Sequence, residues 1–188
     1  MSEQRRTVLA DAAIEVLADT GMRGLTHRAV DRAAGLPPGT TSAYFRTRAA
    51  LLTALVRRLV ARDQAELQAA AAAIAPPRSA AELVDGFAAL ARERLTGEGR
   101  RRSLARYTCA VESVRDPELR EILVPRENAG RDLVRAFLAA HGAGGDPDAR
   151  THTLLACVDG LILDHLLAGA GEVGRDALEG LVAAALRP

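Results

Sequence analysis

The sequence predicts an all-α protein of about nine helices, and three observations support this. Apolar residues recur at helical spacing through most of the 188-residue chain. Alternating runs of β-branched residues are absent, and aromatic residues make up only 3% of the composition. Glycine and proline divide the chain into segments of helical length. We therefore expect an N-terminal three-helix headpiece that contains a helix-turn-helix, followed by a larger C-terminal helical body.

The first segment is an amphipathic helix over residues 4–19. Its apolar positions fall on one face, namely Leu9, Ala12, Ala13, Val16 and Leu17. Gly21 and Gly24 mark its end, and Leu25 supplies an apolar residue directly before Thr26.

The next segment has the pattern of two short helices joined by a tight turn. Thr26 is a good N-cap for the first helix, because its hydroxyl can accept a hydrogen bond from an N–H of the first turn. Gly35 stands where a helix ends with positive φ. We expect the second helix to run from about Pro38 to Tyr44, since proline suits a first helical turn. Two helices that cross through such a turn form a helix-turn-helix, whose second helix enters the major groove of DNA.

Six further helices are expected after this motif. The first of them is long and stops at a pair of prolines, and a later one contains Pro125, which should kink or split it. Ser79 and Glu82 form a capping box, and the segment HGAGGDPD reads as a loop. The predicted helices cover residues 48–74, 79–95, 100–114, 117–141, 148–168 and 175–186, and the loop covers residues 141–148.

Charge is distributed unevenly, although the net charge is only +1. Residues 1–60 contain nine arginines and five acidic residues, which gives +4, and the remaining sixteen arginines and nineteen acidic residues give −3. A basic headpiece suits a DNA-binding protein, because neutralising phosphates drives non-specific affinity.

Several classes of function are disfavoured. No apolar run approaches the roughly 20 residues that span a bilayer, and the N-terminus is not a signal peptide, so we expect a cytoplasmic protein without a membrane partner. Cys109 and Cys157 are isolated and are interpreted as buried apolar residues in a reducing compartment. His152, Asp159 and His165 lack the spacing of a metal site. Neither a nucleophile elbow nor a Gly-rich phosphate loop occurs, so no metal, cofactor or enzymatic activity is expected.

Residues 26–51 follow the pattern T-x-x-x-[IV]-A-x-x-A-G-V-S-x-x-T-L-Y-x-[YH]-F-x-x-K-x-x-L. The residues that match it or replace it conservatively are Thr26, Val30, Ala34, Gly35, Leu36, Thr40, Tyr44, Phe45, Arg48 and Leu51. On these residues the chain resembles the DNA-binding domain of the TetR (tetracycline repressor) family, and the resemblance is strong over residues 3–63. Two departures concern DNA contact, because Pro37 replaces a capping serine and Ser42 replaces a tyrosine that often contacts phosphate.

The resemblance implies a DNA-binding domain over residues 3–63 and an effector-binding and dimerisation domain over residues 64–188. The implied DNA-contacting residues are Thr26, His27, Arg28, Gly39, Thr40, Thr41, Ser42, Tyr44 and Arg48. Some of these have a competing interpretation, namely a polar helix start for the hydroxyl residues, a solvated side chain for Arg28 and core packing for Tyr44. The candidate residues of an effector pocket are Phe87, Tyr107, Cys109 and Asp159, for each of which ordinary core packing is the competing interpretation.

The last two helices are more apolar than one small monomeric body needs. Their apolar residues are Leu154, Leu155, Val158, Leu161, Ile162, Leu166, Leu178, Leu181, Val182 and Leu186. We therefore expect a homodimer, which the resemblance also implies. The favoured function is a ligand-responsive repressor that binds a near-palindromic double-stranded DNA operator and responds to a lipophilic small molecule. The alternative is a dimeric all-α small-molecule-binding or interaction protein without specific DNA binding.

Overall fold

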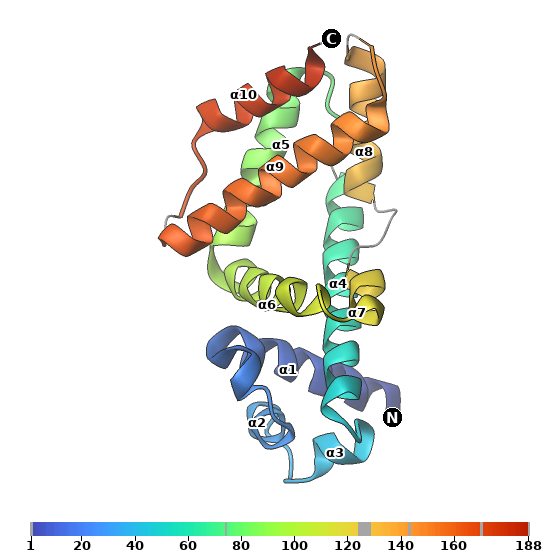
Figure 1. Ribbon diagram of the computed structural model, residues 1–188, viewed down its shortest axis with the longest axis vertical. Coiled ribbons are helices and arrows are strands. Elements are labelled where there is room, and N and C mark those ends of the chain that lie inside the picture. Colours follow the sequence, from blue (N-terminus) through green and yellow to red (C-terminus); the bar gives the residue numbers. More distant parts are fainter. Residues whose placement is uncertain (1, 74, 124–128, 143, 170, 188) are drawn as a thin grey trace. The chain divides into compact units, whose positions relative to one another are not determined.

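The computed structural model describes residues 2–73, 75–123, 129–142, 144–169 and 171–187, and every regular element among them is a helix (Figure 1). The ten helices are α1 (Ser2–Gly24), α2 (His27–Ala33), α3 (Thr40–Tyr44), α4 (Arg48–Ala73), α5 (Ala80–Leu95), α6 (Gly97–Ser113), α7 (Pro117–Leu123), α8 (Ala129–His141), α9 (Pro147–Ala168) and α10 (Arg175–Leu186). The predicted all-α fold is confirmed. The number exceeds the predicted nine because the segment expected as one helix over residues 117–141 forms α7 and α8, while Pro125 lies outside the described residues.

The chain divides into two compact units. The first unit consists of Met1–Asp63 and Arg101–Pro125, and the second of Gln64–Arg100 and Arg126–Pro188. The compact unit that contains the N-terminal helices thus also includes a later segment. The functional division at residue 63 stays a prediction.

The core of the first unit forms from the apolar faces of α1, α2, α4, α6 and α7. Among its buried members are Leu9, Ile14, Leu17, Leu25, Val30, Phe45, Leu51, Leu55, Leu59, Leu119 and Leu123. Ion pairs surround this core: Arg58 reaches Asp11 at 2.8 Å, and Arg101 reaches Glu15 at 2.6 Å and Asp19 at 2.8 Å. These pairs are exposed to solvent to a large extent, which screens them, so apolar packing dominates the stability of the unit.

The end of α1 bends sharply at Gly21. This residue has φ of 65° and ψ of −173°, a backbone conformation open almost only to glycine. The bend leads the chain to Leu25, which is fully buried, and to Thr26, whose hydroxyl accepts a 3.2 Å hydrogen bond from the N–H of Ala29. The predicted cap of α2 is therefore confirmed.

The second unit contains the C-terminal part of α4 together with α5, α8, α9 and α10, and α9 crosses α5 and packs against α8 and α10 (Figure 1). The predicted N-cap at Ser79 is confirmed, but the reciprocal bond of a capping box is not, because Glu82 bonds one residue further back than the N-cap. Ser79 accepts from the N–H of Glu82 at 3.2 Å, and the carboxylate of Glu82 accepts from the N–H of Arg78 at 2.7 Å. Buried residues of the four helices form its core, among them Leu83, Phe87, Val134, Leu138, Leu154, Val158, Ile162, Leu178 and Val182.

The predicted starts of α1, α6 and α9 were too late, and α1 begins at Ser2 rather than at residue 4. Helix α6 begins at Gly97 rather than at residue 100, because the chain turns at Gly97 with φ of 49° and continues directly as helix. Gly99 lies within this helix, where a Cβ would stand 1.9 Å from the carbonyl oxygen of Glu93. Helix α9 begins at Pro147, since the carboxylate of Asp146 caps it by accepting from the N–H of Asp148 at 2.9 Å.

Candidate nucleic-acid interface

The turn between α2 and α3 is longer than the sequence predicted, and α3 is shorter. Gly39 has φ of 91°, a left-handed conformation that suits glycine, so the helix begins at Thr40 and not at Pro38. The carbonyl of Pro37 accepts from both the N–H of Thr40, at 3.2 Å, and its hydroxyl, at 2.6 Å. The two prolines therefore shape the turn and lie outside the helix.

The N-terminus of α3 is held by the carboxylate of Asp31, which belongs to α2. Its Oδ2 accepts from the N–H of Gly39 at 2.8 Å, and its Oδ1 accepts from the N–H of Thr41 at 2.7 Å and from the Thr41 hydroxyl at 2.5 Å. The side chains are buried, with Asp31 3% exposed and Thr41 0% exposed. Burial by itself would raise the pKa of Asp31, but the hydrogen bonds from Thr41 and Gly39 and the charge of His27 hold it below its ordinary value. An ionised carboxylate thus caps α3 in place of a side chain at the N-cap position, where Gly39 has none.

The exposed front of α3 carries small polar groups. Gly39 and Ser42 are exposed and Thr40 is half-buried, while the Ser42 hydroxyl donates to the Gly39 carbonyl at 2.9 Å. Thr41, a predicted DNA-contacting residue, lies inside the unit and its hydroxyl is bonded to Asp31. We therefore leave Thr41 out of the contact set proposed below.

The other predicted contact residues lie around the same motif. The ring of His27 donates from Nε2 to the carbonyl of Phe45 at 2.7 Å, which ties α2 to the C-terminal end of α3. Arg28 is exposed. Arg48, at the start of α4, donates to the carbonyl of Met22 and retains further N–H groups for other acceptors.

An arginine from α1 joins this surface. The guanidinium of Arg6 lies 5.8 Å from the ring centroid of Tyr44 and 5.3 Å from that of Phe45, within the range of a cation–π contact. Arg6, Tyr44 and Arg57 are among the residues that line a shallow hollow between α1 and α4. The motif thus has a positive charge beside the half-buried Tyr44.

Sequence reasoning missed Asp31 and Arg6. Asp31 did leave a signal, because the pattern has alanine at its position and leucine at the position of Thr41. Two apolar positions replaced together by a carboxylate and a hydroxyl are typical of a buried hydrogen-bonded pair. Arg6 left no such signal, since its approach to Tyr44 follows only from the packing of α1.

The four candidate residues of an effector pocket have different surroundings. In the second unit Phe87 is buried in the core and Asp159 is exposed, so these two share no cavity. In the first unit Tyr107 is half-buried and Cys109 is buried in the core, where burial raises the pKa of the thiol to about 12. That thiol is therefore protonated at neutral pH.

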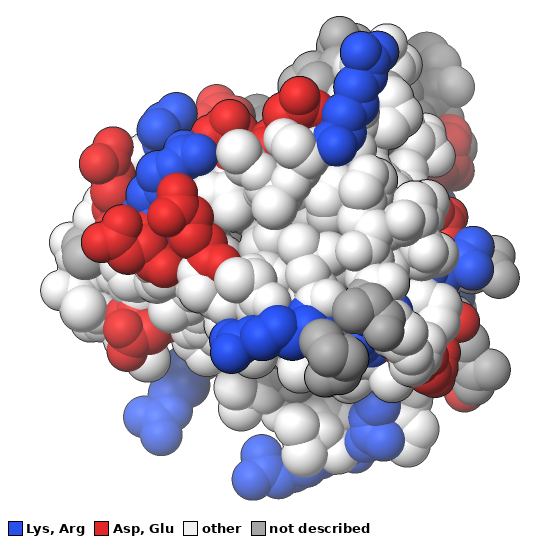
Figure 2. Space-filling view, turned by 90° about the horizontal axis from the view of Figure 1, so that it is seen from above, with Lys and Arg blue, Asp and Glu red and all other residues white. Residues whose placement is uncertain are grey.

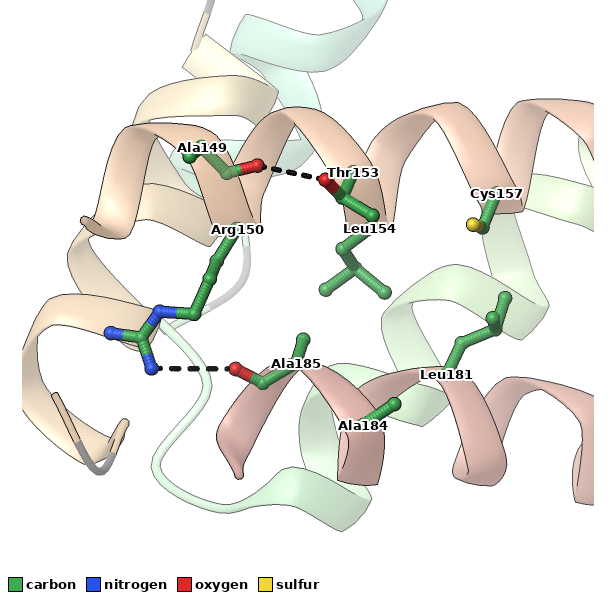
Figure 3. A pocket seen from close by; sticks show the side chains of 8 residues that line it. All are labelled: Ala149, Arg150, Thr153, Leu154, Cys157, Leu181, Ala184 and Ala185. Atoms are coloured by element: carbon green, nitrogen blue, oxygen red, sulfur yellow. Dashed lines mark hydrogen bonds between the residues drawn. The ribbon is translucent and has the colours of Figure 1, made fainter. Parts of the chain in front are cut away.

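A groove of about 270 Å³ lies between α9 and α10 of the second unit, and none of the four candidates lines it (Figure 3). Its lining is mostly apolar, consisting of Ala149, Arg150, Thr153, Leu154, Cys157, Leu181, Ala184 and Ala185. The Arg150 guanidinium donates to the Ala185 carbonyl at 3.5 Å, as Figure 3 shows. Within the described part of the chain, no three His, Cys, Asp or Glu side chains gather in a way that could hold a metal ion.

Helix α9 exposes much of its apolar surface. By length and composition it could cross a membrane, contrary to the expectation that no apolar run is long enough, and 28% of its most apolar window is buried. Leu167 is 79% exposed and Leu163 is 36% exposed. In Figure 2, which views the molecule from above, side chains other than Lys, Arg, Asp and Glu form a broad area with charged groups on several sides. An exposed apolar helix face is typical of an interface with another protein.

A short helix capped across a tight turn, with small polar residues at its front and arginines around it, defines a helix-turn-helix DNA-binding protein. Residues 9–55 match the family "Bacterial regulatory proteins, tetR family", and residues 78–188 match "Tetracyclin repressor-like, C-terminal domain". The chain belongs to the TetR family of transcriptional regulators, as the resemblance implied. Its class is that of DNA-binding regulators and not of enzymes.

Relatives extend the similarity over nearly the whole chain. The HTH-type transcriptional regulator BetI of Rhizobium meliloti (strain 1021) is 29% identical over 170 residues, which cover 90% of this chain and 82% of that protein. The multidrug binding protein EbrR complexed with ethidium is 28% identical with a TM-score of 0.71, covering 97% of this chain and 98% of that one. A TetR-family member from Streptomyces coelicolor A3 is 27% identical with a TM-score of 0.72 and the same coverage.

Proposed function

We propose that this TetR-family regulator is a ligand-responsive repressor that binds a near-palindromic double-stranded DNA operator as a homodimer in the cytoplasm. The observation that carries the proposal is α3, a short helix that α2 holds at both ends and that presents Gly39, Thr40 and Ser42 outward. Small side chains at the front of such a helix let it approach base edges closely. Residues 3–63 would bind DNA, and residues 64–188 would bind the effector and form the dimer.

The proposed contacts fall into two groups. Gly39, Thr40 and Ser42 would read bases, whereas Thr26, His27, Arg28, Tyr44 and Arg48 would position the motif through phosphates. The first test is a gel shift with the DNA that flanks the protein's own gene, repeated at raised salt. Binding that is equal for this DNA and for random DNA would favour the alternative, an all-α ligand-binding protein without specific DNA binding.

Two substitutions separate the groups of contacts. Arg48→Ala should weaken binding to all sequences about equally and lower the salt slope by roughly one unit per subunit, as a lost phosphate contact does. Thr40→Ala should weaken binding to the operator more than to random DNA, because its side chain stands at the front of α3. Arg135→Ala is the control for Arg48, since Arg135 is an exposed arginine of α8 in the second unit. Equal losses on operator and random DNA for Thr40→Ala would remove it from the base-reading group.

The homodimer is supported by α9 and α10. Both helices expose small or apolar residues on their outer faces, among them Ala156, Cys157, Gly160, Leu163 and Leu167 of α9 and Ala177, Gly180, Ala183 and Ala184 of α10. Symmetric pairing of this face with a second copy would bury it, and two-fold dimers are the commonest oligomers. Two headpieces would then meet half-sites roughly 34–36 Å apart in successive major grooves.

The effector is proposed to be a lipophilic small molecule with one or two polar groups, because the helices of the second unit bury mainly apolar side chains. The complex of EbrR with ethidium supports small-molecule binding by a relative. Helix α4 contributes Arg48–Asp63 to the first unit and Gln64–Ala73 to the second, so it offers a covalent path between the two. A ligand that favours the conformation unable to bind DNA would release the operator, with a coupling of typically ~1–3 kcal/mol. Titrating small molecules into the protein–operator complex tests this, and operator affinity that no bound ligand changes would refute it.

A further inference from the structure

We propose that Asp31 is a positioning residue for DNA recognition, whose buried carboxylate sets the placement of α3 and thereby the sequence specificity of binding. The inference rests on the proposed function, because it takes α3 as the helix that reads the operator. Asp31 itself is 3% exposed and reaches no surface from which it could touch DNA.

The argument starts from the length of α3. With five residues, Thr40–Tyr44, it is far too short to be stable by itself, since nucleation of an isolated helix is unfavourable. Its N-cap residue Gly39 has no side chain to bind the free N–H groups of the first turn. The placement of α3 must therefore come from contacts with other elements.

Two contacts from α2 supply this placement. At the N-terminal end, the Asp31 carboxylate accepts from the N–H groups of Gly39 and Thr41 and from the Thr41 hydroxyl. At the C-terminal end, the His27 ring donates to the carbonyl of Phe45. Of the two, the Asp31 contact uses three hydrogen bonds to an ionised acceptor, which are about twice as strong as neutral ones. Asp31 therefore fixes the end of α3 at which the exposed Gly39 and Ser42 lie.

This position predicts an unusual effect on DNA binding. Loss of a phosphate-contacting residue weakens specific and random binding together, because phosphates are present in every sequence. Loss of the Asp31 carboxylate removes no phosphate contact and makes the headpiece more positive. Specific binding should therefore weaken while random binding is kept, and the ratio of the two is the quantity to measure.

Three variants of the full-length protein test this. Asp31→Asn keeps the shape but turns one acceptor into a donor that faces an N–H group. Thr41→Val removes only the hydroxyl donor and keeps the backbone N–H that Asp31 binds. Asp19→Asn is the matched control, because Asp19 lies in the same unit with the same charge but is exposed and paired with Arg101.

The wild-type protein first selects its preferred duplex from a random pool, and fluorescence anisotropy then gives the affinity for this duplex and for a scrambled duplex at two salt concentrations. Asp31→Asn should weaken the selected duplex by about tenfold or more, the effect of a lost charge-assisted hydrogen bond. Its affinity for the scrambled duplex should stay within about twofold, and the salt slope should not change, since no phosphate contact is lost. The affinity of Thr41→Val for the selected duplex should lie between those of Asp31→Asn and wild type. The affinities of Asp19→Asn for both duplexes should equal those of wild type.

Equal weakening of both duplexes by Asp31→Asn, or no weakening of the selected one, would overturn the inference alone. Failure of the wild-type protein to select any duplex would overturn the proposed function, and the inference with it. If Asp31→Asn does not fold, Thr41→Val carries the test together with amide hydrogen exchange at Gly39 and Thr41. Faster exchange at these amides with reduced specificity supports the inference, and full specificity despite faster exchange overturns it.

Discussion

Asp31 is the residue at which burial and hydrogen bonding oppose each other most clearly. Burial disfavours the ionised form of the carboxylate. The hydrogen bonds that Thr41 and Gly39 donate, and the positive charge of His27, favour it. The hydrogen bonds and the charge together outweigh the effect of burial, so the pKa of Asp31 lies below the ordinary value of 3.8. The carboxylate therefore stabilises the first unit as long as it remains ionised.

This lowered pKa predicts how stability depends on pH. A group whose pKa is lower in the folded than in the unfolded state contributes fully above the unfolded value and loses its contribution as pH falls through the folded value. The free energy of unfolding of the wild type should thus exceed that of Asp31→Asn by about 1–3 kcal/mol at pH 5 to 7, because the substitution leaves buried donors poorly paired. The difference should begin to shrink below the unfolded pKa of about 4, and it should be lost as the pH falls through the lowered pKa of Asp31 in the folded protein. Urea unfolding at a series of pH values measures it.

The control for this prediction is again Asp19→Asn. The hydrogen bond from Arg101 also lowers the pKa of Asp19, but that carboxylate is exposed and solvent screens the interaction. Its substitution should change stability far less at every pH. A difference between wild type and Asp31→Asn that grows as the pH falls below 4 would contradict the assignment of an ionised Asp31.

At the scale of elements, the connection from α1 to α2 depends on Gly21. Its φ of 65° and ψ of −173° lie in a region that other residues avoid, and no atom stands within 4 Å of where a Cβ would be. Gly21→Ala should therefore destabilise the protein through backbone strain alone, by about 1–3 kcal/mol. Chemical denaturation measures the loss.

Gly86 provides a control, because its substitution by alanine should change stability in the opposite direction. It lies in the middle of α5, is exposed, and also has open space where a Cβ would stand, but its φ is not positive. Gly86→Ala should stabilise the protein by about 0.5–1 kcal/mol, because alanine loses less entropy in a helix. Similar effects of the two substitutions would show that the bend at Gly21 is not strained for alanine.

At the scale of the whole molecule, the exposed apolar face of α9 predicts the effect of a charge on assembly. Leu167 is 79% exposed, so Leu167→Arg removes little packing within the chain. In a two-fold dimer the change occurs twice, and burial of each leucine contributes about 1.5–3 kcal/mol, so the dimer dissociation constant should rise by about 100-fold or more. Analytical ultracentrifugation over a range of concentrations measures this constant.

Val114→Arg is the matched control for the dimer, because Val114 is 69% exposed and belongs to the first unit. It should leave the dissociation constant unchanged. A wild-type protein that sediments as a stable monomer at micromolar concentration would refute the homodimer, and equal effects of the two arginines would refute its assignment to α9 and α10.

The sequence by itself determined the helices and the family. Helical spacing of apolar residues predicted the all-α fold, and the caps at Thr26 and Ser79 were predicted correctly because a cap bonds within its own first turn. The motif from Thr26 to Leu51 likewise consists of near neighbours in sequence, so the family could be recognised before any contact was known.

Only the tertiary structure decided how α3 begins and what holds it. The start at Thr40, the burial of Thr41 and the capping by Asp31 depend on how α2 packs beside α3. The approach of Arg6 to Tyr44 likewise joins residues far apart in the chain. Periodicity reports which face of a helix is apolar, but it carries no information on which polar groups of two helices meet, because that depends on the geometry of their crossing.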